Sequence, residues 1–270
     1  VFNRRTKIIH TIHSNISVWH PILKWINKLR FLSKSITHVC ISRSIEEAFR
    51  KNYPKLKGCQ INNGITAHVL SRKQEDINLF WKKVYGERKT KECIKLLAIG
   101  NVSGFKNFIL LANAIKLIEQ KHPNIKCALI GRTDNEILVS EINSVRNKNL
   151  KLMGALTNAA DFLTGADALV ISSSQEGMPI VALEALSLSK PIISTPAGGM
   201  VDIVVDGQNG FISRNFELES YIETIEKYLS LNENQIAQMQ KGAYETFLKN
   251  YEIEGVSKQY FNLYTNVVGK

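Results

Sequence analysis

Short, continuous apolar runs alternate with helical patterns along the second two thirds of the chain. The apolar runs lie at 93–100, 125–131, 150–154, 168–173 and 191–196. Helical patterns separate them, for example "NFILLANAIKLIEQK" (107–121) and "PIVALEALSL" (179–188). A strand that is apolar on both faces is typical of a parallel sheet covered by helices on both sides. The pattern therefore predicts an α/β fold with a doubly wound domain, in which ligands bind at the carboxyl ends of the strands.

The first part of the chain shows fewer such runs. It contains three predicted strands, "KIIHTIH" (7–13), "THVCIS" (37–42) and "CQINNGI" (59–65), the last entering an Asn-Gly turn. A helix is expected over 20–34. The charged stretch 67–92 is predicted to be a linker between two regions. The amino-terminal region therefore amounts to about half of a doubly wound domain.

Charge is distributed unevenly along the 270 residues. Residues 1–90 hold 18 lysines and arginines against 5 aspartates and glutamates, a net of +13, whereas residues 91–270 have a net of −2. The helix over 20–34 is basic and amphipathic. Two interpretations weigh equally: it lies on an anionic membrane surface, or its apolar side packs on the sheet and its lysines are solvated. Nucleic acid is not an expected partner, because the sequence has neither zinc-finger spacing nor an aromatic RNA-binding motif.

Composition further restricts the class of protein to which the chain can belong. The chain is 44% hydrophobic, but no apolar run approaches the roughly 18 residues that a membrane span needs. The four cysteines are far apart, with no CxxC pair: Cys40, Cys59, Cys93 and Cys127. We expect buried, reduced thiols in a cytoplasmic protein, rather than a disulfide framework or a zinc site.

Two glutamates, Glu176 and Glu184, lie eight positions apart in "SSSQEGMPIVALEALSLSKPIISTPAGG" (172–199). Pro179 suits the first helical position, so Glu176 is expected in the preceding loop and Glu184 inside the helix. Along a continuous helix, eight residues span about 12 Å. This exceeds the roughly 5–9.5 Å between the paired carboxylates of a glycosidase. The two carboxylates therefore cannot flank one bond, but they can hold two ends of an elongated ligand.

A helix amino terminus lies between these glutamates, where free N–H groups and the helix dipole favour an anion. Gly177 lets a ligand approach the backbone. The order carboxylate, phosphate cradle, carboxylate matches the order sugar, diphosphate, ribose in a nucleotide sugar, because carboxylates accept hydrogen bonds from hydroxyls. The alternative is a helix with one surface glutamate and a capping loop.

The same segment resembles the E-x7-E segment of retaining nucleotide-sugar glycosyltransferases of family 4, which have the GT-B fold. Upstream, "LAIGNVSGFKN" (97–107) resembles the phosphate-binding strand and loop of that family, and "GADALVISSS" (165–174) resembles the strand before the glutamates. "INNGI" (61–65) resembles the turn that enters the carboxyl-terminal domain. The likeness extends through most of residues 8–212. It implies one doubly wound, Rossmann-like carboxyl-terminal domain and a partial Rossmann-like amino-terminal domain.

The resemblance also implies roles for single residues. Glu176 would contact the hydroxyls of the donor sugar, Glu184 the ribose and Lys106 the diphosphate, where a cation offsets the charge of the leaving group. His13 would face the donor sugar from the other domain; its alternative is a histidine at a strand end that bonds to the backbone. The sugar and the distal phosphate would be held by the backbone of Gly177, Met178, Pro179, Ile180 and Val181.

Two positions depart from the family pattern. Asn101 stands where the family usually has an arginine five residues before the lysine. Because asparagine donates a hydrogen bond but carries no charge, Lys106 would neutralise the diphosphate with less help. Thr66 stands where an aspartate is frequent, a difference to which we attach little weight.

The resemblance divides the chain into four parts. These are a partial amino-terminal, acceptor-side domain (1–66), a linker (67–92), the nucleotide-sugar domain (93–250) and a final helix (251–270) that crosses back to the first domain. The amino-terminal domain is expected to lack its opening strands and the acceptor loops that they carry. We therefore expect nucleotide binding with little sugar transfer from this chain.

The resemblance implies a hexosyltransferase that acts with retention on a glycan or lipid-linked acceptor in cell-surface polysaccharide synthesis, without a cofactor or metal. Its expected location is the cytoplasm, peripheral to the membrane. Two alternatives remain open, a GT-B sugar-nucleotide epimerase and an inert nucleotide-sugar-binding fragment. Product analysis distinguishes them, because a transferase makes a new glycosidic bond and an epimerase isomerises the donor.

Overall fold

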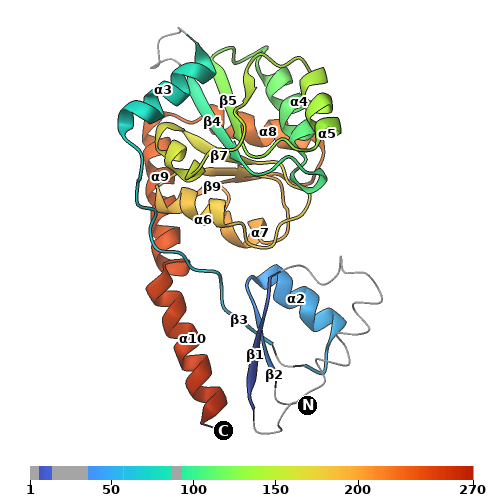
Figure 1. Cartoon of the computed structure of the whole chain (residues 1–270), viewed down its shortest axis with the longest axis vertical. Helices are drawn as coiled ribbons and strands as arrows, with labels where there is room; N and C mark the ends of the chain where they lie inside the picture. Colours follow the sequence, from blue (N-terminus) through green and yellow to red (C-terminus); the bar gives the residue numbers. More distant parts are fainter. Residues whose placement is uncertain (1–5, 14–35, 57, 87–92, 270) are drawn as a thin grey trace.

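The computed structural model describes residues 6–13, 36–56, 58–86 and 93–269 (Figure 1). Its larger unit is built on a six-stranded sheet with the order β6-β5-β4-β7-β8-β9. All neighbouring strands are parallel. The strands are β4 (Ile94–Ile99), β5 (Ile125–Ile130), β6 (Leu150–Leu152), β7 (Ala168–Ile171), β8 (Ile192–Ser194) and β9 (Gly210–Ile212). The doubly wound α/β fold is confirmed, and β9 is the strand of this sheet that the apolar runs did not predict.

Successive side chains of these strands enter two separate cores, as the two-residue period of a strand requires. On β4, Leu96 belongs to one core and Leu97 to the other. The first core lies under α4 (Phe108–Ile118), α5 (Glu136–Ser144) and α8 (Leu218–Leu229). The second lies under the 3₁₀ helix η4 (Ala159–Gly165), α6 (Ile180–Ser187), α7 (Met200–Ile203) and α9 (Glu233–Asn250).

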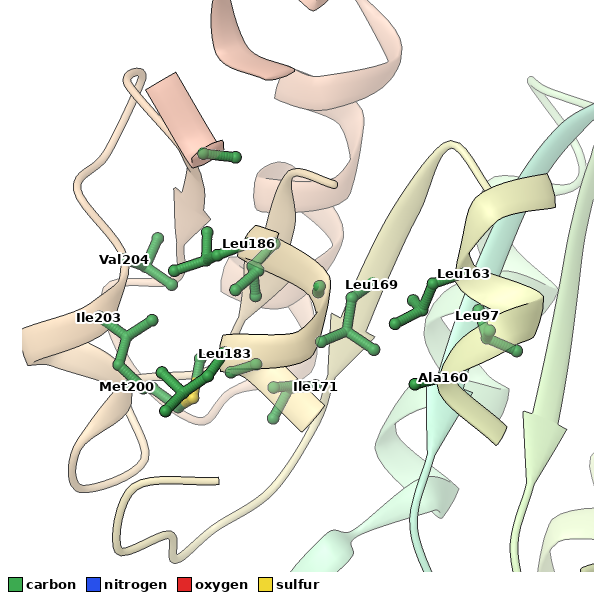
Figure 2. Close-up of a cluster of buried hydrophobic side chains, with 14 of the residues drawn as sticks. Leu97, Ala160, Leu163, Leu169, Ile171, Leu183, Leu186, Met200, Ile203 and Val204 are labelled. Carbon is green, nitrogen blue, oxygen red and sulfur yellow. The ribbon is translucent and has the colours of Figure 1, made fainter. Parts of the chain in front are cut away.

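The second core anchors the helix that carries Glu184. Leu183 and Leu186 of α6 are fully buried, and Figure 2 shows Leu183 beside Met200 and Ile203 of α7. Burying a leucine side chain contributes on the order of 1.5–3 kcal/mol. The position of α6 relative to the sheet is therefore fixed by packing and does not depend on a ligand.

The strand order also predicts where a ligand would bind. The order reverses between β4 and β7, because the chain adds strands on one side of β4 up to β6 and then on the other side from β7. In open parallel sheets, ligands bind outside the carboxyl ends of the strands at such a reversal. The segments that follow β4 and β7 begin there, and they carry Asn101, Lys106 and Glu176.

A second, three-stranded parallel sheet has the order β1-β2-β3. Its strands are β1 (Ile8–Ile12), β2 (Ile36–Cys40) and β3 (Gly58–Gln60), in the positions predicted, although β3 ends earlier than expected. Helix α2 (Arg43–Asn52) was not predicted; its amino terminus is capped by Ser42, which accepts from the Ile45 amide. The basic helix expected over 20–34 lies outside the described residues.

The stretch predicted to be a linker contains helix α3 (Gln74–Tyr85), which packs on the large unit. Its buried residues follow helical spacing: Ile77, Phe80, Trp81, Val84 and Tyr85. The Trp81 indole nitrogen donates to the Phe162 carbonyl oxygen of η4 at 3.2 Å, and the Phe80 and Phe162 rings lie 4.2 Å apart. The high charge of this stretch hid its apolar stripe, so residues 74–85 are part of the large unit.

The final helix, α10 (Ile253–Val268), runs beside the small sheet (Figure 1). Val256 is buried against Val39 and Ile61. The outgoing and returning chains are joined where they pass: the Ile65 amide donates to the Tyr251 carbonyl oxygen at 3.0 Å, and the Ile253 amide to the Ile65 carbonyl oxygen at 3.0 Å. The last helix therefore ties the two sheets together.

All four cysteines are free thiols. Three of them are buried and Cys59 is half-buried. Burial raises the pKa of the Cys40 thiol to about 12. None of the helices in the described residues is long and apolar enough to span a membrane.

The packing of α3 predicts a large cost for Trp81→Ala. We expect this variant to lower the free energy of unfolding in urea by about 3–5 kcal/mol, because it leaves a cavity and an unpaired carbonyl group. Leu79→Ala is the matched control on the same helix, since Leu79 is 53% exposed, and it should change stability by less than about 0.5 kcal/mol. Equal, small effects of both variants would contradict the assignment of α3 to the large unit.

Candidate functional site

The site is centred on an ion pair between the two loops at the reversal point. Lys106 ends the 3₁₀ helix η3 (Gly104–Lys106) after β4, and Glu176 lies in the loop between β7 and α6. The Lys106 Nζ donates to the Glu176 Oε1 at 2.7 Å. The two side chains are 26% and 10% exposed. The structure therefore joins two residues, 70 positions apart in the sequence, whose roles were predicted separately.

The serine run before Glu176 holds the two loops together. Ser172 donates through Oγ to the Lys106 carbonyl oxygen at 2.9 Å, and the Ser174 amide donates to the Phe105 carbonyl oxygen at 2.8 Å. Ser173 donates through Oγ to the Glu176 Oε1 at 2.6 Å. Glu176 thus receives a cation and a hydroxyl on one carboxylate oxygen, which fixes its orientation.

Gly198 and Gly199 lie against the backbone of the Glu176 loop and position it. A Cβ atom on Gly198 would overlap the Glu176 carbonyl oxygen, and one on Gly199 would overlap the Gly177 carbonyl oxygen. Gly198 also has a φ of +50°, in the left-handed region that glycine tolerates best. The "AGG" sequence therefore allows the close backbone contact that holds Glu176 and Gly177 in place.

Helix α6 begins one residue later than predicted. Pro179 has φ −69° and ψ 126° and is the N-cap, so Ile180 is the first helical residue. Met178 is 5% exposed and belongs to the second core. The half-buried Val181 packs against the same core, whereas Ile180 is exposed at 46%. The amino terminus of α6 and its dipole point toward the Glu176 loop, in the sequence order that was expected.

Glu184 lies in the second turn of α6 and is partly buried. Burial raises the pKa of the Glu184 carboxyl above its usual value, the Asp161 carboxylate adds to the rise, and His68 partly offsets it. Ionised Glu184 is therefore incompletely solvated. A ligand with hydroxyl donors would supply the hydrogen bonds that this carboxylate lacks from water.

The neighbours of Glu184 form a cluster that sequence reasoning missed. The fully buried Asp161 contacts the His68 Nε2 at 2.6 Å and accepts from the Ser71 Oγ at 2.6 Å. Burial alone would raise the pKa of the Asp161 carboxyl, but the hydrogen bonds from Ser71 and His68 outweigh it and hold that pKa below the usual range. The cluster fastens the segment after the Asn-Gly turn to η4. The sequence around Asp161, "NAADFL" (158–163), shows no pattern that predicts these contacts.

The small sheet meets the site at Gly177. His13 follows β1 and its side chain is exposed, and a Cβ atom on Gly177 would overlap the His13 carbonyl oxygen. Asn63 donates through Nδ2 to the Met178 carbonyl oxygen at 3.4 Å. His13 and Gly177 are therefore adjacent, and it is the backbone of His13 that makes the contact. A role of the His13 side chain toward the donor sugar stays a prediction.

A hollow of about 800 Å³ opens beside Lys106. It is lined by the predicted residues Asn101 and Lys106 and by residues after β5: Arg132, Asp134, Asn135, Glu136 and Ile137, together with Val102 and Ser103. The Asn101 Oδ1 accepts from the Arg132 amide at 3.1 Å. Neither Glu176 nor Glu184 lines this hollow, so the predicted residues surround the reversal point without sharing one cavity.

The part of the chain that the structure describes contains no group of three or more His, Cys, Asp or Glu side chains that could hold a metal ion.

Comparison with known proteins places the chain among glycosyltransferases. It is 25% identical over 202 residues to the capsular polysaccharide biosynthesis glycosyltransferase CapM of Staphylococcus aureus, covering 74% of this chain and 51% of CapM. It is 22% identical over 240 residues to the N,N'-diacetylbacillosaminyl-diphospho-undecaprenol alpha-1,3-N-acetylgalactosaminyltransferase of Campylobacter jejuni, covering 89% of this chain and 57% of that protein. The chain thus spans about half the length of the curated relatives that it matches.

Solved structures share the fold. Anabaena HepE in complex with UDP superposes with a TM-score of 0.82 at 17% identity, covering 97% of this chain and 73% of HepE. A glycosyltransferase of Rickettsia africae superposes with a TM-score of 0.80 at 16% identity, covering 96% of this chain and 70% of that protein. The GT-B architecture expected from the sequence is confirmed.

The model of the family described as glycosyl transferases group 1 matches residues 80–246. The match covers more than half of the chain and includes Asn101, Lys106, Glu176 and Glu184. The protein therefore belongs to the glycosyl transferases group 1 family.

Proposed function

We propose that the protein takes part in transfer of a hexose, with retention, from a nucleotide-sugar donor to a glycan or lipid-linked acceptor. The observation that carries this proposal is the Lys106–Glu176 ion pair at the reversal point of a group 1 glycosyltransferase fold. A cation and an acceptor carboxylate, side by side beside a helix amino terminus, match a diphosphate joined to a sugar.

The donor would lie along the two glutamates. Its diphosphate meets Lys106 and the amino terminus of α6, its sugar hydroxyls meet Glu176, and its ribose hydroxyls meet Glu184. The backbone from Gly177 to Val181 borders the sugar and the distal phosphate. HepE supports the choice of donor class, since it was solved with UDP and with UDP-glucose.

In this arrangement, Lys106 supports departure of the leaving group. Negative charge grows on the diphosphate as the bond to the anomeric carbon breaks, and an ammonium group held in place stabilises that charge without reorganisation. Glu176 holds the sugar hydroxyls while the anomeric carbon becomes electron-poor. Donor binding would draw Lys106 away from Glu176, because both the diphosphate and the carboxylate need the same ammonium group.

The proposed acceptor is a precursor of a cell-surface polysaccharide. The names of the two relatives support this class, one being a capsular polysaccharide enzyme and the other acting on a diphospho-undecaprenol. A lipid-linked acceptor would bring the protein to the cytoplasmic face of a membrane, where the basic amino-terminal third would meet anionic lipids. His13 and the small sheet border the side of Gly177 from which an acceptor would enter.

Substitutions at the two glutamates should affect the affinities for UDP and UDP-glucose differently. Glu184→Gln should weaken both UDP and UDP-glucose. Glu176→Gln should weaken UDP-glucose but not UDP, whose diphosphate gains the ammonium group that the carboxylate releases. Calorimetric titration of each ligand into each variant measures this. Equal loss of UDP affinity in both variants would contradict the proposed order of the donor.

Glu184→Gln should also stabilise the unliganded protein at neutral pH. The raised pKa means that the folded state disfavours the ionised carboxyl, so Glu184 lowers stability as pH rises through its folded-state pKa. Replacing it with a neutral amide removes this cost, and thermal unfolding between pH 4 and pH 8 measures the difference. A stability gain that is independent of pH would contradict the assigned cause.

A transfer assay with UDP-sugars and lipid-linked or glycan acceptors tests the function itself. A new glycosidic bond with the anomeric configuration of the donor, seen by NMR, supports the proposal and should be insensitive to a chelator. An isomerised nucleotide sugar would identify an epimerase. Binding of the donor without any turnover, also in a chain extended at its amino terminus, would identify a binding fragment and contradict the proposal.

A further inference from the structure

At the point where the strand order reverses, a donor diphosphate would need one more positively charged side chain than Lys106 alone. Lys106 is already paired with Glu176 at 2.7 Å, and Asn101 is uncharged. The diphosphate of a nucleotide sugar carries two negative charges at neutral pH, so one lysine that is shared with a carboxylate cannot neutralise it. Among the described residues, the hollow beside Lys106 has a second cationic side chain in its lining, that of Arg132.

The backbone around Arg132 is fastened to the loop after β4. The Arg132 amide donates to the Asn101 Oδ1 at 3.1 Å, and the Val102 amide donates to the Arg132 carbonyl oxygen at 2.9 Å. A Cβ atom on Gly131 would overlap the Gly100 carbonyl oxygen, so the two strand ends lie against each other. Arg132 therefore lies in the loop just after β5, the strand next to β4, at the level of Asn101.

The Arg132 guanidinium is only weakly engaged. Its Nε lies 3.7 Å from the Asp134 Oδ2, and the two side chains are 64% and 78% exposed. An exposed pair at this distance contributes little to stability. The carboxylates of Asp134 and Glu136 also line the hollow, so a phosphate must compete with them for the guanidinium. A planar guanidinium binds phosphate oxygens in two parallel hydrogen bonds, which the single contact to Asp134 does not match.

From this geometry we infer that Arg132 binds the donor diphosphate and supplies the second positive charge opposite Lys106. Asn101 acts on it through the backbone, because its side chain fixes the Arg132 amide. This inference rests on the proposed nucleotide-sugar function and adds a binding residue from the loop after β5. It also explains how the site works with an uncharged side chain at position 101.

The test is calorimetric titration at low salt with inorganic pyrophosphate and with whichever of UDP, GDP and ADP binds the unmodified chain best. Arg132→Gln should weaken both ligands by about tenfold, as expected for loss of a charge-assisted hydrogen bond. Arg214→Gln is the matched control. Arg214 is an exposed arginine paired with Glu223 at 2.7 Å, after the edge strand β9, and its replacement should change neither affinity.

A compensating variant keeps the test independent of folding damage. Because Asn101 and Arg132 are in contact, Asn101→Arg combined with Arg132→Gln should restore at least part of the lost affinity. If Arg132→Gln changes the affinity for neither ligand while Lys106→Met lowers the affinity for both, the inference is overturned. The proposed function would still stand. Loss of nucleotide affinity without loss of pyrophosphate affinity would also overturn it, since Arg132 would then contact the nucleoside. Absence of nucleotide binding by the unmodified chain would overturn both.

Discussion

The ion pair between Lys106 and Glu176 organises the proposed donor site. It joins the loops that follow β4 and β7, the two strands between which the sheet order reverses. A partly buried pair of this kind is weak support for stability, because removing two charges from water offsets much of their attraction. Its importance lies in its position. It holds an ammonium group and a carboxylate ready where a diphosphate and a sugar would meet, and binding can proceed by exchange of partners.

Much of the surrounding structure serves to fix that pair. Serine hydroxyls and a serine amide join the two loops. Because Gly198 and Gly199 have no side chains, the backbone at these two residues can pack against the backbone of Glu176 and Gly177. The second core holds α6 rigidly, so that the distance from Glu176 to Glu184 is set before any ligand arrives. The small sheet reaches the same loop through the backbone contact of His13 with Gly177. These contacts amount to preorganisation, which lowers the entropy that a ligand must lose on binding.

Features that depend on local periodicity were predictable from the sequence. The strands from β4 to β8 and the helix after Glu176 follow from continuous apolar runs and from the proline and glycines around them. Helix α3 was missed because its apolar stripe lies among many charges, and α2 because the sequence offered only ten helical residues behind a serine cap. Contacts between distant residues could not be read from spacing. The pairing of Lys106 with Glu176, the cluster at Asp161 and the approach of Arg132 to Asn101 all arise from the order of strands in the sheet.

A double-mutant cycle on UDP binding, with Lys106→Met, Glu176→Gln and the two combined, tests directly whether a diphosphate displaces Glu176 from Lys106. If the carboxylate and the diphosphate compete for one ammonium group, Glu176→Gln should tighten UDP binding in the original chain. The same change should have no effect once Lys106 is replaced, so the two substitutions should couple by about 1 kcal/mol or more. Independent, additive effects of the two substitutions in a folded protein would contradict the claim that donor binding takes place by exchange at this ion pair.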